Sequence, residues 1–293
     1  MAMSLNKPLR IIVLLTLLGW QSCSPKLENQ EQLITITTRL GDIKLVLFDD
    51  TPKHKASFLE LAESGAYDST TFYRVIKEFM VQGGDLAVHP QFEKESLRLI
   101  PAEITPTHIH KRGMVGAARQ AVGRNPYRKS STQFYIVQGR TYSKEELTTD
   151  IARLNGALSR YLFNGGHQEL IDEFKALQDS GRIEELQSRI LDLREEIEES
   201  LDMNFDNTEI SQVQIEAYTT AGGAPHLDDG YTVFGQVVEG IETVDKIAYL
   251  EVDSVDNPLE PIYMTLTIEN VPKDSITAWY GIIYPQIIPE EEN

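Results

Sequence analysis

Arg74 lies in a stretch, Thr71–Asp85, whose residue types could support chemistry. A guanidinium is always charged and presents its donors in a rigid planar fork, so a fixed arginine can hold one acceptor in a defined place. Two sets of residues alternate along the stretch, Phe72, Arg74 and Ile76 with Tyr73 and Val75. This alternation predicts a strand with two different faces. Gln82 and the turn-forming Gly83-Gly84 follow. On its own, the stretch is better explained as a buried strand whose arginine pairs with a carboxylate.

Three further motifs follow along the chain. They are Gly113-Met114-Val115-Gly116-Ala117-Ala118-Arg119, Thr132-Gln133-Phe134-Tyr135-Ile136-Val137 and Thr232-Val233-Phe234-Gly235-Gln236-Val237-Val238-Glu239-Gly240. The first stretch resembles the cyclophilin motif F-H-R-V-I-x-x-F-M-x-Q-G-G-D, with Tyr73 in place of the histidine, and all four motifs occur in the order of that family. The resemblance covers Leu33–Gly139 and Pro225–Glu269.

Cyclophilins are peptidyl-prolyl cis-trans isomerases, and the resemblance implies that activity here. The X-Pro bond isomerises slowly because twisting it breaks amide resonance, a barrier of about 18–20 kcal/mol. A catalyst needs only to bind the twisted amide better than the planar one, without a nucleophile, metal or cofactor. The proline nitrogen becomes pyramidal as the bond twists and can then accept a hydrogen bond. The resemblance assigns the donor to Arg74, with Gln82 as its catalytic partner.

The resemblance also implies a substrate-binding set. Its members are Phe79, Met80, Ala118, Arg119, Gln133, Tyr135, Leu227 and Tyr231. Within it, apolar and aromatic side chains would hold the proline ring, Gln133 would help Gln82 to orient the peptide and Arg74, and the backbone at Ala118 and Arg119 would pair with the substrate. The familiar pattern has Asn at Arg119, Phe at Tyr135, Trp at His226 and His at Tyr231. These departures bear on cyclosporin binding more than on isomerisation.

Composition limits the other functional classes. The net charge of −18 disfavours a nucleic-acid partner, because phosphate binding needs a basic face. More than half of that excess lies in Arg140–Gly223, which holds 18 acidic and 8 basic residues. His108 and His110 could share one strand face, but no further residues with ligand spacing point to a metal site. We therefore interpret them, and Glu103, as structural.

Residues 1–22 have the pattern of an export signal, with Lys7 and Arg10 before an apolar run too short to span a bilayer. Cys23, which follows that run, is the one cysteine of the chain, so an intramolecular disulfide is excluded. The basic start, the apolar run and the cysteine together resemble a bacterial lipoprotein signal. We predict that Cys23 is lipidated and that residues 23–31 form a tether. This predicts a protein of the bacterial cell envelope, anchored to a membrane and facing the periplasm or the outside. An ordinary signal peptide with an incidental cysteine is the alternative.

Alternating apolar residues predict strands on both sides of Gly41-Asp42, and again in Arg98–Ile104, His110–Ala118 and Gln133–Val137. Helical signals mark Pro52–Ser64, with Asp50 or Thr51 as its cap. The cyclophilin resemblance implies a closed eight-stranded antiparallel barrel over residues 32–139 and 225–269. It also implies two capping helices, the second near Glu242–Ala248, and a closing strand at Pro261–Glu269.

Heptad-like apolar stripes predict helices in the intervening residues 140–224, as an inserted helical hairpin or three-helix subdomain. The stripes are expected to bury one another, with a docking or dimerisation arm as the alternative. The tail, residues 270–293, is rich in Ile, Trp and Tyr and is expected to pack on the barrel or the insertion. A partner-binding segment is the alternative there.

Two functions follow. The first is an enzyme that isomerises X-Pro bonds of exported or envelope proteins. The second is a non-catalytic proline-peptide-binding or chaperone module, whose acidic insertion docks a protein partner. The retention of Arg74, Phe79, Met80, Gln82 and Gln133 favours the enzyme.

Overall fold

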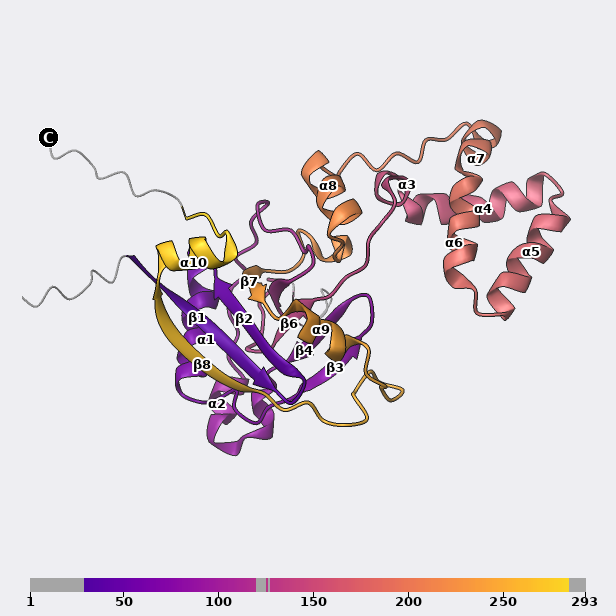
Figure 1. Cartoon of the computed structure of the whole chain (residues 1–293). Helices are drawn as coiled ribbons and strands as arrows, with labels where there is room; N and C mark the ends of the chain where they lie inside the picture. The colour runs from indigo at the N-terminus through magenta and orange to yellow at the C-terminus, as the bar shows by residue number, and fades with distance from the viewer. Residues whose placement is uncertain (1–28, 120–124, 126, 285–293) are drawn as a thin grey trace, which may run out of the picture.

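The computed structural model describes residues 29–119, 125 and 127–284 (Figure 1). Its strands are β1 (Gln30–Thr38), β2 (Gly41–Leu47), β3 (Phe72–Ile76), β4 (Met80–Gly83), β5 (Met114–Ala117), β6 (Phe134–Val137), β7 (Val233–Glu239) and β8 (Thr265–Pro272). Its α-helices are α1 (Pro52–Glu63), α2 (Glu93–Ser96), α3 (Lys144–Thr148), α4 (Ile151–Asn164), α5 (Gln168–Asp179), α6 (Ile183–Asp192), α7 (Arg194–Leu201), α8 (Gln212–Thr220), α9 (Ile241–Ala248) and α10 (Lys273–Tyr280).

The strands form one antiparallel sheet of eight, in the order β3-β4-β6-β5-β7-β2-β1-β8. The sheet curves into a half-barrel, and the predicted closed barrel is wrong. Closure would need a ladder between the edge strands β3 and β8, but the backbone contacts at this edge join residues 69–72 to residues 262–264, which come before β8. Thr71 precedes β3, and β8 begins only at Thr265, so the two strands do not run alongside each other.

The main core lies between the inner face of the sheet and two helices. Phe58 and Leu61 of α1 and Val244 and Ile247 of α9 belong to one buried cluster with apolar residues from most of the strands. In β1 and β2 alternate residues point into this cluster, and some of the residues between them, Leu33 and Val46, are buried on the opposite face under the tail. The two predicted capping helices are therefore present, and they fix the curvature of the half-barrel by filling it.

Some predicted strand segments differ from the structure. Arg98–Ile104 makes only one isolated bridge, from Ile100 to Ser130, and is otherwise irregular. The last predicted strand begins four residues later than expected, at Thr265. β1 begins at Gln30, so the end of the predicted tether pairs with β8 as part of the sheet.

The start of α1 is satisfied by a distant side chain. Thr51 is the N-cap residue, but neither it nor Asp50 provides the expected side-chain cap. Instead, the Glu103 carboxylate accepts hydrogen bonds from the backbone amides of Lys53 and His54, both at 3.0 Å. Glu103 therefore has a structural role, and it satisfies amides that have no partner within the helix.

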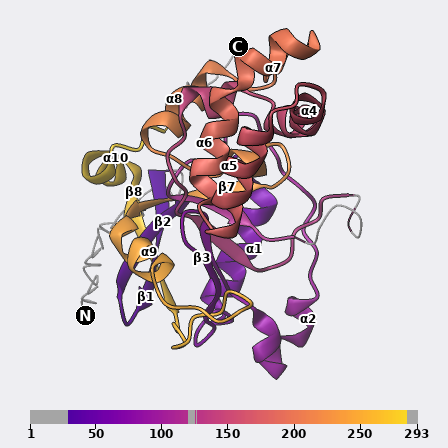
Figure 2. The same ribbon diagram turned by 90° about the vertical axis from the view of Figure 1, so that its right-hand side faces the viewer.

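Helices α4 to α7 form a bundle that stands to one side of the sheet, with α3 and α8 at its base (Figures 1 and 2). Their apolar stripes bury one another in a separate core, which contains Leu154, Tyr161, Phe174, Leu193 and Ile197. The stripe from Ile183 to Leu201 is divided between α6 and α7 at Leu193. This packing is the one expected for the apolar faces, and it gives the bundle a core of its own.

The tail packs on the sheet as far as it is described. Ile276 of α10 is fully buried with Leu33 and Val46, and Ile282 and Tyr284 pack against the same cluster. Residues 285–293, the predicted signal and Cys23 lie outside the described residues. Among those that are described, no helix has the length and apolar character needed to cross a bilayer.

Candidate active site

The sequence motifs meet at a small pocket on the outer face of the sheet. It has a volume of about 90 Å³ and is lined by Arg74, Phe79, Met80, Gln82, Ala118, Arg119, Tyr135, Leu227 and Tyr231. These are all of the predicted site residues except Gln133. Leu227 comes from the short 3-10 helix η5 (Pro225–Leu227), which follows the insertion. The pocket therefore joins both halves of the sequence that the insertion separates.

The strand register places three of these residues in one row. Arg74 on β3 pairs with Gln82 on β4, and Gln82 pairs with Tyr135 on β6. Residues that pair directly across antiparallel strands point to the same face of the sheet. On β4 and β6 the neighbouring residues Val81 and Ile136 point inward, into the main core. Because side chains alternate along each strand, one set lines the pocket on the outer face and the other set fills the core on the inner face.

A β-bulge interrupts the side-chain alternation that the sequence predicts for β3. The register shifts between Phe72 and Arg74, so the two residues do not share one face as a strict period of two predicts. Phe72 is fully buried in the main core, whereas the Arg74 side chain lines the pocket and is 42% exposed. Because of the bulge, the Arg74 side chain lies on the outer face of the sheet, in the pocket lining.

Arg74 has a carboxylate nearby, as expected if the arginine of this strand pairs with an acidic residue. Its Nε lies 3.7 Å from Oδ2 of Asp256, on the loop before β8. That distance is too long for a hydrogen bond, and both side chains are partly exposed, so the pair is a weak one. The carboxylate does not lock the guanidinium, which still lines the pocket.

Gln82 and Gln133 are joined through Tyr73. The Gln82 amide donates to the Tyr73 hydroxyl at 2.5 Å, and this hydroxyl donates to Oε1 of Gln133 at 2.6 Å. Burial is the main cause that raises the pKa of Tyr73, to about 12, so the hydroxyl keeps its proton at neutral pH. Gln133 therefore supports Gln82 from outside the pocket lining. Tyr73 is a site residue that the sequence showed only as a departure from the family motif.

The rim of the pocket is held by Arg119. Its Nε donates to the carbonyl of Gly230 at 2.7 Å, and its guanidinium lies over the Tyr231 ring, 4.1 Å from the centroid. The Ala118 amide donates to the Gln133 carbonyl, and the Ala118 carbonyl accepts from the amide of Ser131. The Ala118 backbone, which was expected to pair with a substrate, is thus engaged within the protein.

Tyr135 forms the floor of the pocket, and its ring lies directly over Gly116. A Cβ on Gly116 would come within 2.2 Å of the ring atom Cζ, so only glycine leaves room for the aromatic ring. The Tyr135 hydroxyl is hydrogen-bonded to Nε2 of His110 at 2.9 Å. Burial raises the pKa of Tyr135 well above its usual value. His110, which the sequence suggested only as a strand or loop residue, thus fixes the floor of the pocket.

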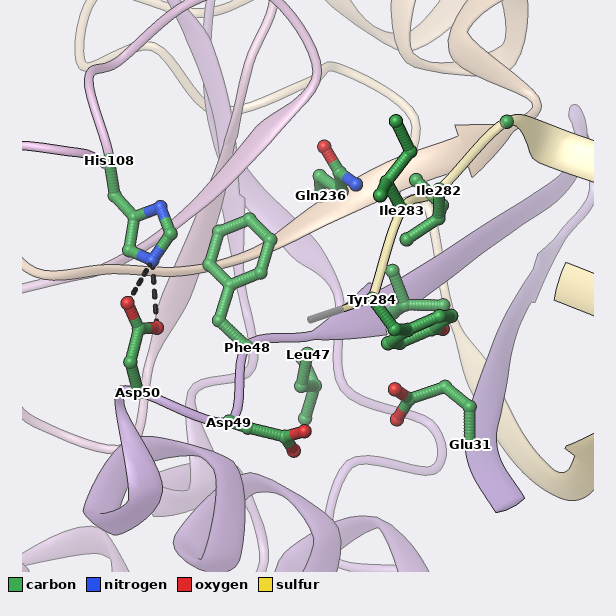
Figure 3. A pocket seen from close by; sticks show the side chains of 12 residues that line it. Glu31, Leu47, Phe48, Asp49, Asp50, His108, Gln236, Ile282, Ile283 and Tyr284 are labelled. Atoms are coloured by element: carbon green, nitrogen blue, oxygen red, sulfur yellow. Dashed lines mark hydrogen bonds and ion pairs between the residues drawn. The ribbon is translucent and has the colours of Figure 1, made fainter. Parts of the chain in front are cut away.

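A larger cavity, of about 550 Å³, lies between β2 and the tail (Figure 3). At one end the His108 ring stacks on Phe48, with centroids 4.1 Å apart, and Nε2 of His108 lies 2.8 Å from both carboxylate oxygens of Asp50. Ile283 and Tyr284 form the other end. Its lining contains none of the predicted site residues, so size alone does not identify the functional site. Within the described residues, no group of three or more His, Cys, Asp or Glu side chains could hold a metal ion.

The model of the cyclophilin type peptidyl-prolyl cis-trans isomerase/CLD family matches residues 33–157 and 159–268. The chain belongs to this family. A protein of Streptococcus pyogenes, named as a bifunctional phosphatase/peptidyl-prolyl cis-trans isomerase, is 32% identical over 80% of this chain but only 38% of its own length. A protein of Staphylococcus epidermidis, named as a peptidyl-prolyl cis-trans isomerase, is 27% identical over 82% of this chain and 93% of its own length.

A crystal structure of a cyclophilin-type isomerase from Cryptosporidium parvum superposes with a TM-score of 0.48 at 20% identity, covering 83% of this chain and 99% of that one. A likeness at that level adds nothing to the family assignment, which the family model carries. The chain is thus of the cyclophilin type, a family named for peptidyl-prolyl cis-trans isomerase activity. Its pocket unites Arg74, Gln82 and the apolar residues that the resemblance singled out.

Proposed function

We propose that the chain isomerises X-Pro bonds by stabilising the twisted amide with the Arg74 guanidinium. The observation that carries this proposal is the position of Arg74 at the wall of a pocket otherwise formed largely by Phe79, Met80, Tyr135 and Leu227. A proline ring fits such apolar and aromatic walls, while the arginine lies where the neighbouring amide would twist. No side chain has to form a covalent bond with the substrate.

The planar and the twisted amide differ in how well the nitrogen accepts a hydrogen bond. The nitrogen of a planar amide is a poor acceptor, because its lone pair is delocalised into the carbonyl group. Twisting localises that lone pair, so a nearby N–H donor stabilises the transition state more than the ground state. When a peptide covers the pocket, its apolar walls would exclude water from the twisting amide and so strengthen the interaction. The loose contact with Asp256 leaves the guanidinium able to turn toward this acceptor.

The test is exchange NMR of a short Ala-Pro peptide with the purified full chain. Arg74→Ala should reduce catalysed exchange by about 100-fold, the loss typical of removing one preorganised transition-state donor. Arg74→Lys is the matched control, because it keeps the charge but loses the rigid fork, and we expect it to recover only part of the rate. Peptide binding without faster exchange would instead support the alternative, a proline-peptide-binding module.

We also propose that the substrates are exported or envelope proteins and that Cys23 carries a lipid. The support is the sequence alone: a short apolar run behind a basic start, followed within a few residues by the chain's one cysteine. Two acyl signals, or one acyl chain with another contact, are needed for stable anchoring. Mass spectrometry of the mature protein tests this directly. An N-terminus other than Cys23, or an unmodified Cys23, would contradict the proposal.

A further inference from the structure

A buried chain of hydrogen bonds leads from the proline pocket to the helical insertion. It begins at the Tyr135 hydroxyl, which lies 2.9 Å from Nε2 of His110. The other ring nitrogen, Nδ1, lies 2.9 Å from Oδ1 of Asp228, and the His110 backbone amide donates to the same oxygen at 2.8 Å. The side chains of His110 and Asp228 are only 1% and 7% exposed. This chain therefore lies in the interior, behind the floor of the pocket.

The second oxygen of Asp228 is bonded to the insertion. Oδ2 accepts the Tyr218 hydroxyl at 2.6 Å and the Gln214 amide at 2.8 Å, and both residues belong to α8. Tyr218 is fully buried. α8 lies between the bundle and the sheet (Figure 1). Asp228 thus receives donors from α8 on one oxygen and from His110 on the other.

The directions of these bonds are fixed by the carboxylate. Since an ionised carboxylate can only accept, Nδ1 of His110, the Tyr218 hydroxyl and the Gln214 amide all donate to Asp228. Burial opposes ionisation of Asp228, but the bonds from His110, Tyr218 and Gln214 together lower its pKa below the usual value. The carboxylate therefore fixes the direction of every bond that it makes and joins His110 to α8.

The backbone brings α8 close enough for these bonds. A Cβ on Gly223 would lie 2.3 Å from the His110 carbonyl oxygen and 2.6 Å from the Tyr218 ring. The chain leaves the sheet at Gly139 and returns at Gly223, and a Cβ on Gly139 would lie 2.4 Å from the Gly223 Cα atom. Two glycines thus allow the exit and return of the insertion to cross in contact with each other, directly beside His110.

We propose that α8 of the insertion is a positioning element of the isomerase site. Tyr218 and Gln214 hold Asp228, which orients His110, which in turn fixes the Tyr135 ring at the floor of the pocket. Asp228 also directly follows Leu227, another residue of the pocket lining. The last helix of the insertion therefore helps to hold Tyr135 in place in the pocket of the half-barrel.

This inference rests on the proposed function, in which Tyr135 contacts the proline ring. The first variant is Tyr218→Phe, which removes one hydroxyl and keeps the ring. We expect kcat/KM for an Ala-Pro peptide to fall about fivefold, with weaker binding of that peptide, because a charged acceptor loses one donor. Tyr161→Phe is the matched control, since Tyr161 donates to Glu196 inside the bundle and has no contact with the chain of bonds.

The second variant is Gln214→Glu. Gln214 forms a capping box with Ser211 at the start of α8, and glutamate also suits that position, so the helix keeps its cap. The new carboxylate would face Asp228 and repel it, and we expect a loss of kcat/KM of about tenfold or more. Equal activities of Tyr218→Phe, Gln214→Glu and Tyr161→Phe would overturn the proposal.

A double-mutant cycle separates positioning from a general loss of stability. In a Tyr135→Phe background the chain of bonds no longer reaches the pocket, so Tyr218→Phe should cause no further loss of peptide affinity. Full additivity of the two losses would overturn the proposal. Peptide affinity, measured by titration, is independent of turnover. A parent protein that binds the Ala-Pro peptide without accelerating exchange would contradict the proposed function, while the same cycle would still decide whether α8 positions Tyr135.

Discussion

Arg74 and Asp256 face each other at 3.7 Å between Nε and Oδ2, close enough for attraction but not for a hydrogen bond. Asp256 has a positive φ of 66°, which Asn tolerates well, so Asp256→Asn removes the charge without backbone strain. Because the pair is partly exposed, we expect the free energy of unfolding to change by less than about 1 kcal/mol. We expect kcat/KM to change less than about threefold, far below the effect of Arg74→Ala.

This prediction is checked by urea unfolding and by peptide exchange at low and high salt. A large loss of kcat/KM in Asp256→Asn would show that Asp256 orients Arg74 during turnover. The backbone carbonyl of Asp256 accepts from the amide of Val75 at 2.8 Å, and this bond is kept in the variant. The comparison therefore isolates the carboxylate from the loop that carries it.

Gly116→Ala should damage the pocket through a single methyl group. The new Cβ would come within 2.2 Å of the Tyr135 ring, whose hydroxyl is held by His110, so the ring has no easy way to move. We expect a stability loss of about 1–3 kcal/mol, as for other overpacked sites, with a marked loss of peptide affinity. Thermal unfolding and peptide titration measure the two effects.

Gly156→Ala is the control for that variant. Gly156 lies within α4, and a Cβ there would meet no atom within 4 Å. Alanine in a helix interior is favoured over glycine by about 0.5–1 kcal/mol, so this variant should be slightly more stable and bind peptide as the parent does. Unchanged affinity in Gly116→Ala would contradict the contact between Gly116 and Tyr135.

Local patterns in the sequence predicted the elements that carry the site. The strand at β3, the strand segment that contains β6 and the helix α1 depend on neighbouring residues, so a short window contains the necessary information, whereas α9 was implied by the family resemblance. The order of the four motifs then placed most of the pocket lining correctly. The β-bulge at Arg74 was not predictable in the same way, since a register shift depends on the partner strand.

Contacts between distant residues could not be derived from local patterns. Glu103 caps α1 from 49 residues away, and Asp228 meets His110 across 118 residues, so topology rather than spacing decides both pairs. The failure of barrel closure is of the same kind. It depends on how far β8 extends alongside β3, and the alternation in either strand is compatible with both outcomes.

His54 should make the fold sensitive to mild acid. Its Nδ1 lies 2.6 Å from Glu103, its Nε2 lies 2.7 Å from the hydroxyl of Ser130, and its side chain is only 2% exposed. Burial lowers the pKa of His54, against the Glu103 carboxylate that raises it. A folded pKa below the unfolded value of about 6.5 means that the unfolded chain binds the proton more readily.

The free energy of unfolding should therefore fall as the pH drops below about 6.5, and this loss should level off below the folded pKa of His54. Urea unfolding at pH 7.5 and 5.5 measures it. His54→Asn keeps a donor for Glu103 but cannot titrate, so we expect it to be less stable at pH 7.5 and to show a smaller difference between the two pH values. An undiminished difference in His54→Asn would assign the pH dependence to other groups.

The bundle core should be separable from the pocket. Ile197 of α7 is fully buried among the helices α4 to α7, and Ile197→Ala should leave a cavity that costs about 2–5 kcal/mol. Because the chain of bonds to Tyr135 starts at α8, outside that core, kcat/KM should stay within about twofold of the parent. Hydrogen exchange should accelerate in α4 to α7 but not in β4 or β6.

Phe163→Ala is the matched control for Ile197→Ala, since Phe163 also lies in the insertion but is 79% exposed. It should alter neither exchange nor activity, because little apolar surface is lost from the interior. If Ile197→Ala instead lowered kcat/KM in step with the loss of protection in the bundle, the support of the pocket would extend from α8 into the whole insertion. A parallel loss of protection in α8 would locate that connection, since α8 shares the base of the bundle with α3.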